Sequence, residues 1–507
     1  MMDVRVTNAL DAAAAADAVT RSAIVTGGGD STDVWRRVLG QTLTDGESVR
    51  VLQEHGRKGN FLGALQACDR LRGENGALRA IEQLVMFVGA GSRLSPVTQA
   101  LHNMKAALRL PSGHEGSGTL TVGEAAVRSS APWIRALRAG GFDGIVIRWG
   151  DEIMIPSTDL TARAGEFADV DAVRFGYYAR PTELLASQKE WLLTDERGDV
   201  YAELPRQPLE RLLGHVSRYR SVKALHVNLG SFAISYDLLD ALGQAFGDLI
   251  GPDDVAANWD PYVWMALHSS TRIEWEADCR GGRSEVPRDF AELVEAIPDF
   301  WRRVQSAKSA LAERTGRAFA SRVFDFGDPY WFDAGNHAAL RGGLGDVFGS
   351  GRDGETLRAF LGLPEGLSRG ASLIRDSRIE PGAEIRNSIV IDSTVSHAES
   401  FAERSIVLSS ELGRLRADPG SVVIECACPM LEVDGPEGFA IRLDSSAHVR
   451  GDEVTAGLRT PDGPLRLSHF GPSVIVDGER YESRLWANPI SFKAASDLVA
   501  QTCAEQS

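Results

Sequence analysis

A six-residue period between residues 372 and 412 constrains the fold of this chain more than any other feature. The first rank consists of Leu373, Ile379, Ile385 and Ile391, and a second rank four positions behind each consists of Ser377, Ala383, Ile389 and Val395. A period of six matches neither an α-helical turn nor simple strand alternation. Hexapeptide repetition is typical of a parallel β-helix, which stacks one apolar side chain under the next. The rank loses phase after His397, which predicts a short or interrupted coil; the alternative is a few strands with coincidental spacing.

Upstream of this repeat, a short apolar run breaks into a glycine-rich loop. The run ends at Val88, and the loop comprises Gly89, Ala90, Gly91, Ser92 and Arg93. Glycine permits positive φ angles and a close approach of backbone N–H groups to a phosphate. Arginine adds a planar, permanently charged donor for phosphate oxygens. This pattern predicts a phosphate-binding loop, and the alternative is a strand-to-helix turn with a surface arginine.

The whole segment from Gly89 to Thr98, GAGSRLSPVT, resembles the signature loop of the sugar-1-phosphate nucleotidyltransferases, G-x-G-x-R-L-x-P-L-T. Only Val97 departs from that pattern. Members of this family join a nucleoside triphosphate to a sugar 1-phosphate and release pyrophosphate. The resemblance implies that residues Val88 to Arg93 bind the nucleotide and that Arg93 acts on its phosphates.

The family places a lysine after this loop, and here Lys105 is the nearby candidate, two residues farther from Thr98 than the common spacing. It would neutralise pyrophosphate oxygens as a second catalytic cation. A solvated helix lysine is the competing interpretation, and Arg109 is the alternative cation.

Joining two anionic phosphates requires a divalent cation, and magnesium takes few protein carboxylates beside phosphate and water oxygens. Asp151 follows Gly150 at the end of the apolar run Ile145 to Ile147, similar to the family's metal-binding G-D motif. Asp333 lies in the segment YWFDAGN, similar to W-x-D-x-G-T, with Asn336 in place of threonine. The resemblance implies that Asp151 and Asp333 bind Mg²⁺ and that Gly150 lines the nucleotide site. The alternatives are that Asp151 is an ordinary turn residue and that Asp333 only helps to begin a helix.

The sugar side of the resemblance is less complete. Glu203 lies in VYAELP, which resembles the E-K-P segment that contacts the sugar and its phosphate, but Leu204 occupies the lysine position. The substitute cations considered are Arg206 and Lys223. Asn228 and Gly230 lie in VNLGSF, which resembles the N-x-G-x-Y/F strand lining the sugar pocket; Asn228 as an ordinary turn residue stays open.

Length and charge restrict the class of protein. The 507 residues exceed one ordinary core, and a formal net charge of −16 argues against nucleic-acid binding or membrane attachment through bulk charge. The five scattered cysteines imply no disulfide framework. The N-terminal segment lacks the pattern of a secretory signal, so we expect a cytoplasmic protein.

These patterns predict a helical N-terminal extension (1–80), an α/β nucleotidyltransferase domain (81–345), a linker helix with a β-helix (346–420) and a β-rich cap of antiparallel hairpins (421–507). The order of a Rossmann-like domain and a left-handed β-helix resembles the ADP-glucose pyrophosphorylase and mannose-1-phosphate guanylyltransferase branches of the family. We expect nucleoside triphosphate and sugar 1-phosphate as ligands, and a homo-oligomer.

Two other functions remain open from the sequence. A catalytically inactive nucleotide-sugar sensor is favoured by Leu204 and by the short separation of 62 positions between Gly89 and Asp151, which is small for a base-recognition subdomain. Gly118 and Thr119 are the candidates for the base-reading turn. A β-helix acyltransferase would need His397 as its base.

Overall fold

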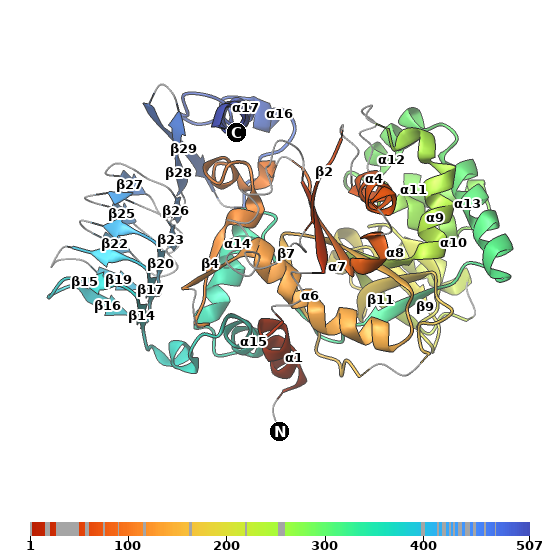
Figure 1. The fold of residues 1–507 in the computed structure, drawn as a ribbon, viewed down its shortest axis with the longest axis horizontal. Coiled ribbons are helices and arrows are strands. Elements are labelled where there is room, and N and C mark those ends of the chain that lie inside the picture. Colours follow the sequence, from red (N-terminus) through yellow and green to blue (C-terminus); the bar gives the residue numbers. More distant parts are fainter. Residues whose placement is uncertain are drawn as a thin grey trace.

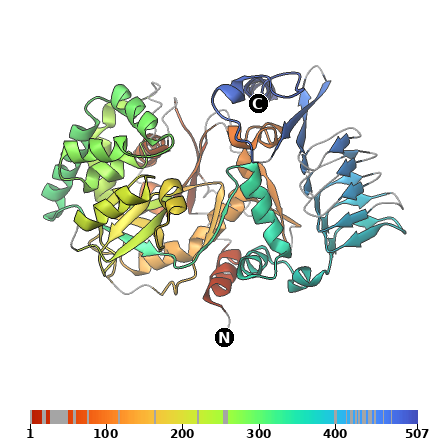
Figure 2. The same ribbon diagram turned by 180° about the vertical axis from the view of Figure 1, so that it is seen from behind.

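The structure is a computed structural model of the chain. It describes residues 3–15, 21–26, 50–55, 60–74, 77–89, 91–114, 118–161, 165–218, 221–251, 259–396, 401–412, 415–417, 422–424, 427–428, 431–433, 439–441, 447–449, 453–460, 463–471 and 473–506. A sheet domain and a coil of strands lie on opposite sides of the molecule (Figures 1 and 2). None of the helices in these segments is long and apolar enough to cross a membrane.

A nine-stranded sheet forms the centre of the α/β part. Its strands are β1 (Ser22–Thr26), β2 (Arg50–Gln53), β3 (Gln83–Phe87), β6 (Gly144–Trp149), β8 (Ala172–Tyr178), β9 (Trp191–Thr194), β10 (Val200–Leu204), β11 (Ala224–Ser235) and β12 (Ser321–Asp325). The order β10-β9-β11-β6-β3-β1-β2 is continued by β8 and β12 from β11. Only β10 and β11 run against the others, so the sheet is mostly parallel, as the sequence predicts.

Two of these strands correct the predicted N-terminal boundary. The segment 1–80 contains the helices α1 (Val4–Ala13) and α4 (Asn60–Gly73), but it also supplies β1 and β2. β1 lies between β2 and β3 in parallel register. Every residue of β1 is buried, because an interior parallel strand is covered on both faces. This N-terminal segment is therefore part of the sheet domain and not a helical extension.

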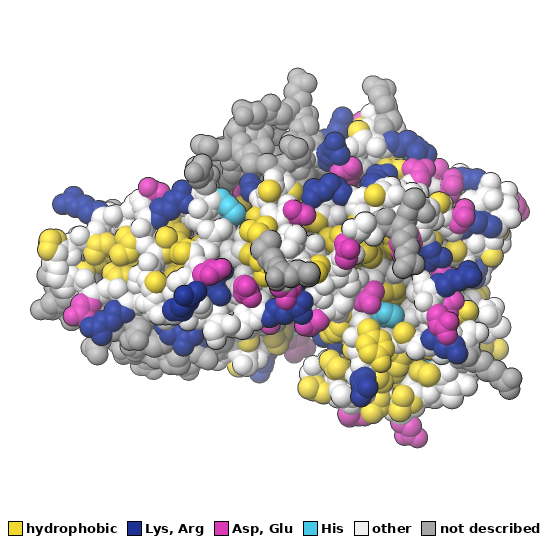
Figure 3. All heavy atoms as spheres, turned by 90° about the horizontal axis from the view of Figure 1, so that it is seen from below, with side chains coloured by type: hydrophobic (Ala, Val, Ile, Leu, Met, Phe, Trp, Pro, Cys, Tyr) yellow, Lys and Arg dark blue, Asp and Glu magenta, His cyan; other side chains and the backbone are white. Residues whose placement is uncertain are grey.

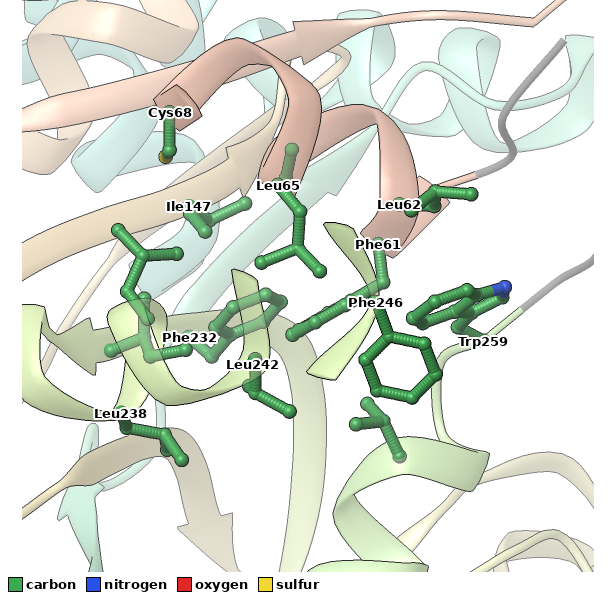
Figure 4. Packing of buried hydrophobic residues seen from close by; sticks show 14 of the residues in the cluster. Phe61, Leu62, Leu65, Cys68, Ile147, Phe232, Leu238, Leu242, Phe246 and Trp259 are labelled. Atoms are coloured by element: carbon green, nitrogen blue, oxygen red, sulfur yellow. The ribbon is translucent and has the colours of Figure 1, made fainter. Parts of the chain in front are cut away.

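Helices cover both faces of the sheet, and β6 shows the alternation. Ile145 and Ile147 join the cluster under α4, α9 (Tyr236–Ala245), α10 (Tyr262–His268) and α13 (Phe300–Thr315), which Figure 4 shows around Phe61. Val146 faces the opposite cluster, which includes Trp133 of α6 (Val122–Ala139). Successive strand residues point to opposite faces, so both helical layers are anchored on the same strand. The other described α-helices that precede the coil are α5 (Val97–Ala100), α7 (Glu183–Gln188), α8 (Leu209–Arg218), α11 (Arg272–Arg280), α12 (Val286–Ala296), α14 (His337–Gly345) and α15 (Arg352–Leu361).

Two small antiparallel pairs connect the sheet to the coil. They are β7 (Glu152–Ile155) with β13 (Tyr330–Asp333), and β4 (Arg109–Pro111) with β5 (Thr119–Thr121). The predicted base-reading turn lies at the second pair, where a Cβ on Gly118 would stand 2.4 Å from the Ile391 side chain of the coil. Gly118 is therefore packed against the coil.

After α15 the chain winds through three parallel sheets. The strands are β14 (Leu373–Arg375), β15 (Arg378–Ile379), β16 (Glu384–Arg386), β17 (Ile389–Ile391), β18 (Thr394–Val395), β19 (Phe401–Glu403), β20 (Ile406–Leu408), β21 (Glu411–Leu412), β22 (Leu415–Ala417), β23 (Val422–Ile424), β24 (Ala427–Cys428), β25 (Leu431–Val433), β26 (Phe439–Ile441), β27 (Ala447–Val449) and β28 (Glu453–Thr460). Leu373 pairs with Ile389, so one turn of the coil is slightly shorter than three complete hexads. Leu373, Ile379 and Ile385 thus lie on three different sides of one turn.

The coil is longer than predicted. Parallel pairing continues from β23 through β26 to β28, so the predicted cap of antiparallel hairpins is wrong for this region. The turns from Leu373 to Ile389 and from Ile389 to Ile406 both fall short of three hexads, and they differ in length. Such turns displace a strict six-residue rank, which explains the loss of phase after His397, a residue outside the described segments. In the described part of the C-terminal region, β28 and β29 (Gly463–Phe470) pair as an antiparallel hairpin, and the helices α16 (Glu479–Glu482) and α17 (Phe492–Gln506) follow.

The coil has one open end. Leu373, Ile379 and Ile385 of the first turn are only half-buried, whereas Ile389 and Ile391 of the next turn are buried. Figure 3 views the molecule from below, with hydrophobic side chains gathered on the left, on the side of the coil. Buried residues of the later turns of the coil form one apolar cluster with residues of α1, α5, α14, α15 and α17. This cluster fixes the coil to the rest of the molecule.

Candidate active site

The glycine loop and the Gly-Asp turn meet because their strands are neighbours. Met86 of β3 pairs with Trp149 of β6 in parallel register, so both chains leave the sheet at the same edge. The Gly150 N–H donates to the Met86 carbonyl at 3.0 Å. A Cβ on Gly150 would stand 1.9 Å from the Phe87 ring. Only glycine lets the Gly150 turn approach this strand end so closely.

The loop itself bends through two glycines in the left-handed region. Gly89 has φ +100° and faces open space, whereas Gly91 has φ +60° and is enclosed. A Cβ on Gly91 would lie 2.7 Å from Thr98 Cγ2 and 3.2 Å from Lys105 Cγ. The Thr98 hydroxyl donates to the Gly91 carbonyl at 2.8 Å. The loop is therefore folded against Lys105.

The other predicted loop residues have different environments. Val88 packs on the core of the sheet domain, and Ala90 lies outside the described residues. The Ser92 hydroxyl donates to Asp477 Oδ1 at 3.2 Å, so the C-terminal segment touches the loop. Arg93 is the middle residue of the short 3-10 helix η3 (Ser92–Leu94), and its side chain is exposed.

The two predicted metal ligands, 182 positions apart in the sequence, come together beside this loop. Asp333 pairs with Glu152 across β13 and β7, and the Ala334 N–H donates to the Asp151 carbonyl at 2.9 Å. The Gly335 N–H donates to Asp333 Oδ1 at 2.6 Å, and a Cβ on Gly335 would lie 2.7 Å from that oxygen. The antiparallel pairing of β7 with β13 thus positions both carboxylates.

Lys105 and Arg93 balance part of this negative charge. Lys105, in the short helix η4 (Lys105–Ala107), donates to Asp151 Oδ2. Burial acts to raise the pKa of Asp151, but the charge and hydrogen bond of Lys105, with the charge of Arg93, hold that pKa below its usual value. The structure thus places near Asp151 the two cations that the sequence analysis assigns to the phosphates.

The same two cations compensate Asp333 less. Burial and the neighbouring charge of Asp151 raise the pKa of Asp333, and burial with both aspartates raises the pKa of Glu152 well above its usual range. Crowded carboxylates favour a bound cation, and oxygen donors are the ligands that Mg²⁺ prefers. Within the described segments no three potential metal-binding side chains gather. A magnesium ion held by Asp151 and Asp333 would therefore need its other ligands from phosphate and water.

A buried arginine that the sequence analysis did not single out holds the Gly-Asp turn by hydrogen bonds to its backbone. Arg148 is fully buried; its guanidinium donates to the Glu152 carbonyl at 2.5 Å and to the Trp149 carbonyl at 3.3 Å. These bonds tie together the residues on either side of Gly150 and Asp151. Its position at the end of an apolar strand resembles an ordinary core position, so the sequence carries little signal for it.

The predicted sugar end lies along β11, where the strand changes partner. Residues 224–227 pair with β9 and residues 232–235 pair with β6, leaving Asn228 to Ser231 between the two. Gly230 has φ +84°, and its N–H donates to Asn228 Oδ1 at 3.1 Å. The Asn228 amide nitrogen donates to Glu203 Oε1 at 3.1 Å and Glu190 Oε2 at 3.2 Å. The structure thus brings the three predicted sugar-binding residues together.

Glu203 is part of the interior and not of the surface. It accepts from Arg174 at 2.7 Å, and both side chains are 0% exposed. Asp260 lies 3.8 Å from the same guanidinium, whose carbon stands 4.6 Å from the Trp264 ring centroid. Burial raises the pKa of Glu203 to about 8 and that of Asp260 to about 7 despite the adjacent Arg174. In this arrangement Glu203 orients Asn228.

Leu204, which occupies the position of the family's lysine, is part of the apolar core. Its side chain is buried among Trp191, Leu193 and Leu212, on the face of β10 opposite Glu203. Of the substitute cations, Arg206 is paired with Glu285 at 2.7 Å, and Lys223 is exposed beyond the far end of β9. Arg109 donates to Ser409 of the coil at 2.7 Å.

The sequence analysis missed a cation that lies closer. Both β6 and β9 pair antiparallel with β11, each with a different part of it. The residues just before β9 therefore lie next to the residues just after β6. Lys189 is one of these residues, and its Nζ lies 4.0 Å from the Trp331 ring centroid. The available signal is the pair Lys189-Glu190 directly before a buried apolar strand.

Searches with this sequence find no matching protein-family model and no significantly similar curated protein.

Proposed function

We propose that this chain is a magnesium-dependent sugar-1-phosphate nucleotidyltransferase. It would transfer a nucleoside monophosphate from a nucleoside triphosphate to a sugar 1-phosphate and release pyrophosphate. The observation that carries the proposal is the meeting of Asp151, Asp333 and Lys105 beside the glycine loop. On this proposal the sheet domain is Rossmann-like and the coil is a left-handed β-helix.

Each group near the loop has a role in this reaction. The N–H groups of the glycine loop and the exposed Arg93 fork would bind the polyphosphate. Asp151 and Asp333 would hold Mg²⁺, which when bound neutralises the phosphate oxygens and polarises them. Lys105 would contribute a point charge at the leaving pyrophosphate.

The reaction itself needs orientation more than proton transfer. An oxygen of the acceptor phosphate attacks the α-phosphorus in line, a new P–O bond forms, and the bond to pyrophosphate breaks. No covalent intermediate with the enzyme is required. The protein lowers the barrier by holding two anions together and by compensating their charge.

Lys105 has a different partner before and during this reaction. In the structure the Lys105 ammonium is bound to Asp151, where it takes up part of the space that a metal ion at that carboxylate would need. A magnesium ion on Asp151 would release Lys105 toward the phosphates. The half-buried pair, with 22% of the Lys105 side chain and 20% of the Asp151 side chain exposed, can exchange partners without unfolding.

A catalytically inactive nucleotide-sugar sensor is the second candidate, because Leu204 is in the core and Glu203 is fully buried. The deciding experiment measures pyrophosphate release from a panel of nucleoside triphosphates and hexose 1-phosphates with Mg²⁺. Turnover by the natural sequence, lost in Asp151→Asn and Asp333→Asn, supports the transferase. Nucleotide binding without turnover across the panel contradicts it and favours the sensor. His397, required by an acyltransferase, lies outside the described residues.

A further inference from the structure

One ammonium group beside the carboxylates has no anionic partner among the described residues. In the described part of the chain, the Lys189 side chain forms no ion pair or hydrogen bond, and its Nζ lies over the Trp331 ring at 4.0 Å from the centroid. The side chain is half-buried, so the group is held in place and still reaches solvent. An aromatic face fixes the position of an ammonium without neutralising its charge.

Trp331 places Lys189 on the side of the metal ligands. Residues two apart on a strand share a face, so Trp331 and Asp333 of β13 point the same way. The pKa of Lys189 is lowered by burial, while the charges of Asp333 and Glu152 act to raise it, as expected for a cation near both. The ammonium thus lies within electrostatic reach of the proposed magnesium ligands.

Lys189 also adjoins the sugar end. The Asn228 N–H donates to the carbonyl of Glu190, the next residue, at 2.9 Å. On the other side, a Cβ on Gly230 would lie 3.2 Å from Nε1 of Trp149, which ends β6. Lys189 therefore lies between the carboxylate pair and the bulge that contains Asn228 and Gly230.

We propose that Lys189 binds the phosphate of the sugar 1-phosphate and holds it beside Asp151 and Asp333. The inference rests on the proposed transferase function and assigns the acceptor cation to the residues before β9. An unpaired, positioned ammonium next to a carboxylate-bound metal suits a phosphate that must touch both. Arg206 is less suited because it is already paired with Glu285.

The test compares Lys189→Met with Lys223→Met, an exposed lysine at the opposite end of β9. KM and kcat are measured separately for a hexose 1-phosphate and for the nucleoside triphosphate, and binding of both ligands is measured by calorimetry. We expect Lys189→Met to raise KM for the hexose 1-phosphate by about tenfold or more, with KM for the nucleotide within about twofold. Lys189→Arg should recover part of the loss, and Lys223→Met should behave as the natural sequence.

Each other outcome overturns the assignment in a recognisable way. Unchanged hexose 1-phosphate KM and affinity in Lys189→Met removes Lys189 from the acceptor site while the transferase stands. An equal loss for the nucleotide places Lys189 at the polyphosphate instead. A natural chain that binds Mg²⁺ and nucleotide but no hexose 1-phosphate overturns the transferase and the assignment together. Lys189→Gln replaces Lys189→Met if the latter has a lower unfolding midpoint.

Discussion

The two ends of the candidate site differ in how their charges are balanced. At the nucleotide end, Asp151 and Lys105 are about one-fifth exposed and form a pair that a metal and a phosphate can separate. At the sugar end, Glu203 and Arg174 have no exposed surface and are bonded to each other. Groups of the first kind are available to ligands, whereas those of the second kind belong to the fold. Substitutions at the two ends should therefore affect different measurements.

The largest expected effect is on turnover at the nucleotide end. Asp151→Asn keeps the size of the side chain but removes the negative charge that the metal requires. We expect kcat to fall by about 10²- to 10³-fold, equivalent to about 3–4 kcal/mol of lost transition-state stabilisation. The unfolding midpoint should change little, since the carboxylate is partly exposed. Asp376→Asn, at an exposed aspartate of the coil, is the matched control. Turnover near that of the control would remove Asp151 from the mechanism.

At the sugar end the main effect should be on folding. Arg174→Met removes the guanidinium bonded to Glu203 and leaves that buried carboxyl without its cationic partner, with the Asn228 amide as its remaining donor among the described residues. Loss of one partner of a buried pair costs about 3 kcal/mol or more in the free energy of unfolding. Chemical denaturation measures it, with Arg197→Met, in an exposed turn, as control. Equal free energies of unfolding for Arg174→Met and Arg197→Met would contradict the view that Arg174 is part of the fold.

The pH dependence of stability gives a third, smaller distinction. Burial raises the pKa of Glu203 from 4.5 to about 8, so the folded state keeps a proton that the unfolded state has lost. This stabilisation is complete below the unfolded pKa and disappears as the pH rises through the folded value. Between about pH 7 and 8, where ordinary histidines are neutral, we expect the free energy of unfolding to fall by about 1 kcal/mol.

Glu203→Gln should reduce this slope because glutamine does not ionise, and the slope that remains should come from Asp260, whose pKa burial raises to about 7. The same substitution should leave the affinity for the nucleotide unchanged, since Glu203 lies at the sugar end. Denaturation curves of both chains across this pH range decide the matter. A natural chain whose stability rises toward pH 8 would show that Glu203 is ionised in the fold.

The smallest predicted effect separates two glycines of one loop. Both have positive φ, but a Cβ on Gly91 would meet Thr98 and Lys105, whereas one on Gly89 would meet open space. Each alanine carries a conformational cost of about 1–2 kcal/mol. Gly91→Ala should in addition displace Lys105 and weaken nucleotide binding more than Gly89→Ala does. Equal nucleotide affinities in calorimetry would mean that the contact with Lys105 has no role.

The sequence predicts the nucleotide end better than the sugar end, for a physical reason. The apolar strands at this end are followed directly by the residues of interest, Gly89, Gly91, Gly150 and the two aspartates. A glycine or aspartate directly after an apolar run is a local pattern that the sequence shows. The convergence of these residues depends on β3 lying beside β6, which the alternation of strands and helices makes predictable. Lys189 was not predictable in this way, because its position depends on β6 and β9 sharing one edge of β11. Arg174 was not predictable either, because it lies on β8, at the other edge of β11, and meets Glu203 of β10 only in the folded sheet. No local spacing records that arrangement.

The coil and the N-terminal segment show the same limit. The hexad period correctly indicates parallel stacking from Leu373 onward, but turns shorter than three hexads hide the continuation to β28. The strand Ser22–Thr26 is short and stands among helical patterns, so its place between β2 and β3 depends on long-range pairing. Short strands fixed by tertiary contacts are the elements that sequence periodicity identifies least well.

The central claim is that Asp151 and Asp333 bind one divalent cation next to the glycine loop. Crystals grown with Mn²⁺ and a non-hydrolysable nucleoside triphosphate would test it by anomalous diffraction. The account predicts one manganese peak within bonding distance of both carboxylates, with the polyphosphate lying along residues 89 to 93. A peak bound to neither aspartate, or a nucleotide bound away from this loop, would contradict it.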